Sequence, residues 1–362
     1  MNMKHLALTA VIMAALPGLA VASGLNNSQE PPNTPSGFLD LPSDMNALEL
    51  PGIDEEPQPA AAMKVVARII DDYSDQIETH MNTALDKHVE SAQSLLSDMK
   101  DRTGRPDKYS DFTHSVNYED SINTPDGAEG LIRLGYERGF GNGVHVGGNF
   151  ETKISSKNEH TKWGMFIQRD IVNEPHTLGL MGAITSTWFD VSDGEMSRFD
   201  GNVGAHYKYN ADGPFGFYGD ALVSKATNNA KFMFEDVRAS SIYGSDVSIL
   251  GAGIHFKFME HWSGDLGVQE TKAGADEATF EFEYDDVVQH SNVSIDDRSN
   301  QITRGSLKYE NGMFTNTING SCGEDDCSAT MTPKVQFDNG IFIEGTIGED
   351  SMSTKAGYRL RM

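Results

Sequence analysis

Residues able to carry covalent or acid–base chemistry are few and scattered in this chain. Its 362 residues include two cysteines and 11 histidines, but no Gly-x-Ser-x-Gly elbow, His-Glu-x-x-His pair or Walker-type phosphate loop. His145, His206 and His255 stand singly within stretches of alternating polar and apolar residues. An isolated histidine on a polar strand face is far more often a lumen or interface residue than a catalytic one. We therefore expect no enzyme activity, no cofactor and no metal centre.

The two cysteines, Cys322 and Cys327, enclose the short sequence Gly-Glu-Asp-Asp. A zinc site would need further Cys or His ligands close by, and this stretch offers none. Exported proteins meet an oxidising environment in which such pairs form disulfides. We predict a small disulfide loop at the tip of a hairpin.

Acidic side chains gather at Asp285-Asp286, Asp296-Asp297 and Glu324-Asp325-Asp326. Their oxygen atoms suit calcium, but no twelve-residue EF-hand pattern is present, so calcium binding stays open. We interpret these stretches as a hydrated acidic rim that disfavours anions. The net charge of −26 argues against nucleic acid as a partner, because nucleic-acid binding needs basic patches.

Residues 1–22 have the pattern of a secretory signal. The apolar run Leu6–Leu16 is too short for a membrane helix, which needs roughly 20 residues. Ala20 and Ala22 supply the small-x-small pattern that places cleavage before Ser23. No later window is apolar enough for a membrane helix, so we expect an exported protein.

Two segments precede the strand-like region. Residues 23–61 are rich in Pro, Ser, Asn and acid, a composition typical of a disordered linker. Residues 62–102 have one apolar seam at helical spacing, which predicts a long amphipathic helix. The seam could pair with a copy of itself in a coiled coil, pack on the periplasmic face of a barrel, or enter a lumen. It consists of Val66, Ile70, Tyr73, Ile77, Met81, Leu85, Val89, Ala92, Leu96 and Met99.

Residues 109–362 alternate with a period of two, which predicts an all-β domain. Six tight turns, near 139–143, 173–176, 210–213, 259–260, 310–312 and 338–340, alternate with longer connections that include 191–196, 225–246 and 273–300. This layout favours an antiparallel up-and-down barrel of about 14 strands over a β-sandwich. The segments 232–237 and 279–287 also alternate and could extend hairpins beyond the membrane or add strands, so 12–16 strands are possible. The strands are expected near 110–119, 129–139, 143–155, 160–171, 176–190, 196–209, 214–224, 247–258, 261–272, 301–310, 312–320, 328–337, 340–347 and 352–362.

The last eight residues alternate strictly, with Ala356, Tyr358, Leu360 and Met362 on one face. This stretch resembles the C-terminal assembly signal of bacterial outer-membrane β-barrels. The positions that carry the resemblance are Lys355, Gly357, Tyr358, Leu360 and Met362. The resemblance implies a barrel in the cell outer membrane of a Gram-negative bacterium, surrounded by lipid and inserted by the barrel assembly machinery.

Such a barrel presents one face of each strand to lipid and the other to the lumen. Aromatic residues near the strand ends suit the girdles at the two interfaces; these are Trp163, Trp188 and Trp262. The lumen is expected to be lined by both charges, with Arg133, Glu137, His206, Lys208, Asp265 and Arg304 among its residues.

Three functions fit this architecture. The first is a channel for passive passage of small hydrophilic solutes. The second is a translocator or anchor, because a helix before a barrel resembles the translocation unit of autotransporters, in which a helix lies in the lumen. The third is an adhesion or structural barrel that acts through the acidic loops 225–246 and 273–300. The position of the 62–102 helix discriminates between an open channel and the translocator.

Overall fold

The computed structural model describes residues 58–105, 108–121, 129–154, 160–210, 214–323, 327–348 and 351–361. The predicted signal peptide with Ala20, Ala22 and Ser23, nearly all of the linker, and Met362 therefore lie outside the described residues.

The helix α2 spans Gln58–Arg102 and begins four residues before the predicted start. Pro59 is tolerated there because the first turn of a helix needs no N–H from it. Gly104, with a φ of 84°, follows the last turn as glycine commonly does at helix ends. Within the described residues, no helix has both the length and the hydropathy to cross a membrane.

The described strands follow α2 in chain order. They are β1 (Lys108–Ser121), β2 (Glu129–Phe140), β3 (Val144–Ile154), β4 (His160–Asn173), β5 (His176–Val191), β6 (Gly194–Asn210), β7 (Phe215–Phe234), β8 (Val237–Met259), β9 (Trp262–Ala275), β10 (Ala278–Tyr284), β11 (Val287–Val293), β12 (Arg298–Asn311), β13 (Phe314–Cys322), β14 (Cys327–Gln336), β15 (Ile341–Ile347) and β16 (Ser351–Arg361).

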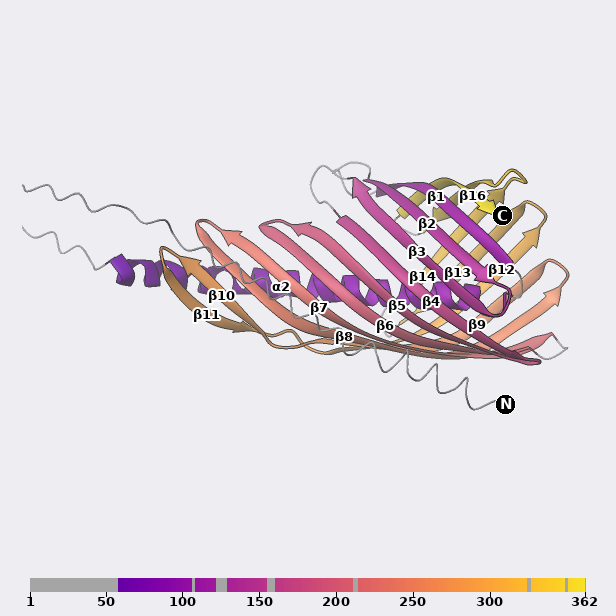
Figure 1. Ribbon diagram of the computed structural model, residues 1–362, viewed down its shortest axis with the longest axis horizontal. Coiled ribbons are helices and arrows are strands. Elements are labelled where there is room, and N and C mark those ends of the chain that lie inside the picture. The colour runs from indigo at the N-terminus through magenta and orange to yellow at the C-terminus, as the bar shows by residue number, and fades with distance from the viewer. Residues whose placement is uncertain are drawn as a thin grey trace, which may run out of the picture. The chain divides into compact units, whose positions relative to one another are not determined.

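The strands form one antiparallel sheet that closes on itself (Figure 1). Closure runs through β1 and β16, paired from Asp111↔Arg361 to Ser121↔Ser351, and through β8 and β9. Of the 16 strands, β10 and β11 stand outside the ring as a hairpin on the distal part of β8, which leaves 14 in the barrel. The sequence prediction of an antiparallel barrel of about 14 strands is confirmed, and the terminal strand takes its expected place at the closure.

Three connections predicted to be long are instead strand. Residues 191–196 contain only a tight turn between β5 and β6, and 225–246 belong to β7 and β8, which turn at Glu235 and Asp236. Residues 273–300 hold the β10–β11 hairpin, whose turn residues Asp285 and Asp286 both have positive φ, 44° and 63°, as hairpin turns of this length favour. The strands continue past the barrel because their inner faces have an apolar partner, α2, to pack against.

The outer face of the ring carries an apolar belt. On β7 the outward side changes from Val223, which is 51% exposed, to Lys225 and Lys231, which marks one boundary of this belt. Trp188 is exposed on the outer face. Trp163 and Trp262 also lie on this face, because they pair in register with the outward residues Phe150 and Met259, respectively. The belt includes Leu134, Tyr136, Phe150, Met165, Ile167, Phe199, Val203, Tyr207, Phe217, Leu250, Leu266, Ile318, Met331, Ile343 and Tyr358.

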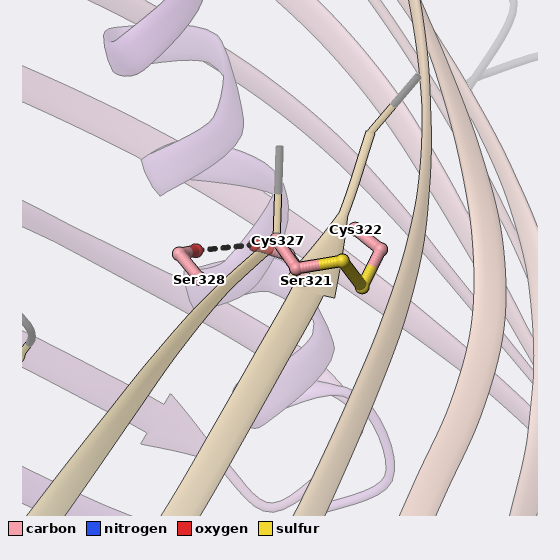
Figure 2. The surroundings of a disulfide bond; sticks show 4 residues. All are labelled: Ser321, Cys322, Cys327 and Ser328. Atoms are coloured by element: carbon pink, nitrogen blue, oxygen red, sulfur yellow. Dashed lines mark hydrogen bonds between the residues drawn. A yellow bond between two sulfur atoms is a disulfide. The ribbon is translucent and has the colours of Figure 1, made fainter. Parts of the chain in front are cut away.

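The disulfide joins the last register pair of β13 and β14. Cys322 and Cys327 face each other across the ladder with Cα atoms 4.0 Å apart. Ser321 and Ser328 form the preceding pair, and their hydroxyl oxygens lie 2.9 Å apart (Figure 2). The bond therefore fastens two neighbouring strands at one end of the barrel wall.

Gly357 in the closing strand gives a first test. A Cβ atom there would lie 2.2 Å from the carbonyl oxygen of His114 and 2.6 Å from the ring of Phe342. We expect Gly357→Ala to destabilise the barrel by about 1–3 kcal/mol through overpacking and to lower the level of folded protein. Heat-modifiable migration of outer-membrane fractions measures that level. Gly345→Ala is the matched control, because its Cβ would meet nothing closer than 3.9 Å; equal levels of both variants would contradict the account.

The occupied lumen as candidate functional site

Figure 1 shows α2 running inside the ring of strands, and its apolar seam packs on the inner wall of the barrel. The sequence left three positions open for this helix, and in the structure the helix lies in the lumen. The seam that a coiled coil would use is buried against the protein's own strands. Its fully buried members include Val66, Ile77, Met81, Leu85, Leu96 and Met99, and they pack on residues of β5–β11 such as Met181, Met196, Leu222, Phe232, Val247, Ile249 and Phe280. Ile69 is also fully buried, whereas the predicted seam residue Ile70 is only partly buried.

Beyond the apolar belt, aromatic rings hold the N-terminal half of α2. Tyr73 stacks on Phe234 with ring centroids 4.4 Å apart, and His80 stacks on Phe232 at 5.3 Å. Phe232 in turn stacks on Phe280 of the added hairpin at 5.9 Å. Burial lowers the pKa of His80, which the nearby Asp193 partly opposes, so this imidazole is neutral at pH 7. We refer to these aromatic residues as the outer clamp.

Polar contacts fix the middle of α2 to the same wall. The imidazole of His88, fully buried, lies between two hydroxyls, with Nε2 2.7 Å from Ser224 Oγ and Nδ1 3.0 Å from Ser245 Oγ. Asn228 donates to Ser245 at 2.9 Å. A buried imidazole that has both nitrogens partnered fixes the rotation of the helix about its axis.

Arg198 on β6 contacts the backbone of α2. Its guanidinium bonds Asp200 at 2.6 Å and donates to the carbonyl oxygens of Ala84 and Lys87 at 3.1 and 3.2 Å. Both charged side chains are at most 1% exposed. A buried ion pair is costly to break, because removing one partner leaves the other charge without compensation.

A third set of contacts holds the C-terminal end of α2, close to the start of β1. Arg102 donates to Gln168 Oε1 at 3.1 Å and lies over the ring of Phe166, 3.8 Å from its centroid. Gln168 donates to Thr103 Oγ1 at 3.1 Å. The backbone N–H of Gly104 donates to Asp170 at 2.7 Å. Contacts thus hold the helix at three places: its C-terminal end, its middle and the N-terminal half that contacts the outer clamp.

The structure places two of the expected lumen residues near this end of α2. Glu137 accepts a hydrogen bond from the Tyr109 hydroxyl and lies 3.8 Å from the guanidinium of Arg102. Arg133, two positions along the same face of β2, forms an ion pair with Glu151.

The other four expected lumen residues also lie on inward faces. His206 Nδ1 lies 2.6 Å from Asp220 Oδ1, and the same carboxylate bonds Lys100 of α2. Asp265 lies 2.8 Å from His255 Nδ1. Lys208 and Arg304 pair in register with inward positions, Tyr218 and Gly267.

Sequence reasoning missed the residues that grip the middle of α2. Arg198 and Asp200 lie on the same face of β6 as His206 and Lys208, so extending that alternation upstream would have placed them in the lumen. The partners of His88 on β7 and β8 gave no signal, because the predicted loop 225–246 hid the strand that carries Ser245.

The helix does not fill the lumen. A cavity of about 320 Å³ separates it from the wall of β2–β6, and a second of about 130 Å³ lies toward its C-terminal end. Asp98 and Asn149 line both cavities, so the two adjoin along one face of α2. The buried apolar cluster includes residues of β5–β11 but none of β12–β16 within the described residues, which places α2 off centre.

These features define the class: a closed antiparallel barrel of the outer-membrane type whose lumen holds its own N-terminal helix. Neither a protein-family model nor a curated protein sequence matches the chain.

Among solved structures, the chain is similar to the translocator domain of the autotransporter NalP from Neisseria meningitidis, with a TM-score of 0.50, 11% identity, and 78% of this chain and 98% of that one covered. It also matches the Pseudomonas putida toluene transporter TodX, with a TM-score of 0.46, 9% identity, and coverage of 71% and 89%. A third match is the CymD monoaromatic hydrocarbon channel, with a TM-score of 0.42, 9% identity, and coverage of 70% and 87%. At this identity, the likeness to NalP shows the fold.

Replacing Arg198 tests whether its buried ion pair and its hydrogen bonds to α2 stabilise the barrel. Arg198→Met leaves Asp200 buried and uncompensated, so we expect the unfolding free energy to fall by about 3–5 kcal/mol. Urea unfolding of the purified barrel measures it. The matched control is Arg238→Met, because Arg238 and its partner Glu283 are 64% and 49% exposed and such pairs contribute about 1 kcal/mol or less.

The double variant Arg198→Met/Asp200→Met should recover most of the loss, because it removes the orphaned charge together with its partner. Equal stability of Arg198→Met and Arg238→Met would show that the buried pair does not hold the helix.

Proposed function

We propose that the protein is a translocator or anchor barrel of the outer membrane, in which α2 lies in the lumen and leads the preceding residues to the cell surface. The observation that carries this proposal is the burial of the α2 seam inside the ring. An unoccupied channel for free diffusion would leave that lumen open. The fold shared with an autotransporter translocator domain supports the proposal.

The direction of α2 supports surface exposure of its N-terminal end. Bacterial barrels keep both chain ends of the ring on the periplasmic side, and here β1 begins where β16 ends. The C-terminal end of α2 contacts this side through Asp170 and Tyr109. A helix of 45 residues is about 68 Å long, more than twice the hydrocarbon thickness of about 30 Å. Its N-terminal end therefore emerges on the opposite side.

Passage of small hydrophilic solutes is the second candidate function. The observation that favours it is the pair of adjoining polar cavities beside α2, of about 320 and 130 Å³. In this version the barrel is a channel narrowed by its own helix. Adhesion through 225–246 and 273–300 receives less support, because these segments are largely strands whose inner faces pack on α2.

Labelling of single cysteines in intact cells tests the proposal. Ser36→Cys, in the segment before α2, should react with a membrane-impermeant maleimide, as should Glu235→Cys in the outer turn of β7 and β8. Glu174→Cys, in the turn between β4 and β5, should react only after the outer membrane is permeabilised. The native cysteines are joined to each other and do not react. Labelling of Ser36→Cys only in permeabilised cells would contradict surface exposure.

A further inference from the structure

His80 carries the imidazole of the outer clamp. It is 8% exposed, and its ring stacks on that of Phe232. The ring of Phe232 also lies against those of Phe234 and Phe280, with centroids 5.7 and 5.9 Å away. Within the described chain, the Nε2 atom of His80 is buried and has no hydrogen-bond partner. A neutral imidazole is tolerated among these rings, but an imidazolium would bring a charge and an additional N–H donor into them.

Asp193, in the turn between β5 and β6, is a charged residue whose field reaches this imidazole. Its carboxylate is already engaged, because it accepts hydrogen bonds from the Gln76 amide and the Ser192 hydroxyl. The buried phenol of Tyr243 on β8 is uncharged at and below neutral pH. The positions one turn away from His80 on α2 are uncharged as well; they are Gln76, Ile77, Thr83 and Ala84.

Further charged groups around the clamp lie on exposed faces. Those on the polar side of α2 are Asp72, Asp75 and Glu78. Others form exposed ion pairs, namely Lys231 with Glu195, Arg238 with Glu283, His290 with Glu281, and Arg68 with Glu235. Among the described residues, Asp193 is thus the group that could compensate an imidazolium at His80, and it does so only in part.

The direction of the pH effect follows from the burial of His80. Burial lowers the pKa of this imidazole, and Asp193 opposes that effect without cancelling it. Outside the clamp, an imidazole titrates near its ordinary pKa of about 6.5. A released helix therefore binds more protons than a clamped one once the pH falls below that value. The clamp has its full stability above about pH 6.5 and loses it as the pH falls toward the lowered pKa of the clamped imidazole.

We propose that the outer clamp is an acid-sensitive switch, in which protonation of His80 raises the population of a state whose N-terminal half of α2 has left β7 and β10. The middle of the helix stays in the lumen, because Arg198 holds the carbonyl oxygens of Ala84 and Lys87 without involving His80. The switch operates in either candidate function, since α2 lies in the lumen in both. It lengthens the segment that is free at the surface without emptying the barrel.

Hydrogen–deuterium exchange of the full-length barrel in lipid nanodiscs tests the switch. The exchange rates of residues 62–80, corrected for the intrinsic rate at each pH, give the opening constant of this part of α2. Between about pH 7.5 and about pH 5 this constant should rise at least about threefold in the native protein. In His80→Phe, which keeps an aromatic ring but cannot be protonated, most of that rise should disappear. Asp193→Asn should show a larger rise than the native protein, because the carboxylate that favours the imidazolium is gone.

The matched control is His290→Phe, which removes an imidazole from an exposed position of the β10–β11 hairpin, where it is 60% exposed beside Glu281. This variant should keep the native pH response. His80→Leu replaces His80→Phe if the latter fails to give heat-modifiable barrels. Three results would overturn the proposal: no rise in the native protein, equal rises in the native protein and the His80 variant, or a rise in Asp193→Asn no larger than the native one.

Discussion

The apolar seam of α2 is the constraint on which the rest of the structure depends. A 45-residue helix with one continuous apolar stripe is unstable in water unless that stripe is covered, since each large side chain buried contributes about 1.5–3 kcal/mol. The barrel supplies the cover on its inner side, which is unusual for a wall that ordinarily faces water. Residues such as Met181, Leu222 and Ile249 are apolar and inward-facing. Without the helix to cover them, these side chains would be exposed to water in the lumen.

The same constraint explains the strands that continue past the apolar belt. A sheet that leaves the membrane has no lipid to cover either face, so an apolar inner face there would be exposed. The extension of β7 and β8, with the β10–β11 hairpin beside them, buries Phe232, Phe234 and Phe280 against the N-terminal half of α2. Its outer face carries charged residues such as Lys231 and Arg238 together with the exposed apolar residues Met233, Ile242 and Val288. The inner faces of the barrel and of its extension thus form one continuous surface on which the single helix packs. The polar side of that helix faces the cavities.

Much of this architecture follows from the sequence alone, and the missing parts have physical reasons. Strand number and closure were predictable because Asn-Gly and Asp-Gly turns interrupt a period-two pattern, and because the segment around Gly357 ends the ring. The helix was predictable from the spacing of its apolar residues. Its position was not, because an apolar seam can pack equally well on another helix or on the wall of a barrel. The inner residues of β5–β9 carried the clue, since Met196 and Leu222 are apolar on the same face as Arg198 and Asp220. The outer extension was predicted only as an alternative, because the short alternating stretches 232–237 and 279–287 are interrupted by acidic turns, such as Glu235-Asp236, that resemble loop sequence.

The central claim, that α2 resides in the lumen against β7, is tested most directly by a thiol crosslink across that contact. His88→Cys and Ser224→Cys replace two residues that contact each other, with Nε2 and Oγ 2.7 Å apart, so a short bifunctional thiol reagent should span the two new thiols. We predict an intramolecular crosslink in protein taken from the outer membrane and treated with that reagent. His88→Cys paired with Thr332→Cys, on the opposite wall at β14, should remain uncrosslinked. Absence of the first crosslink, or equal yield of both, would contradict a helix held against that wall.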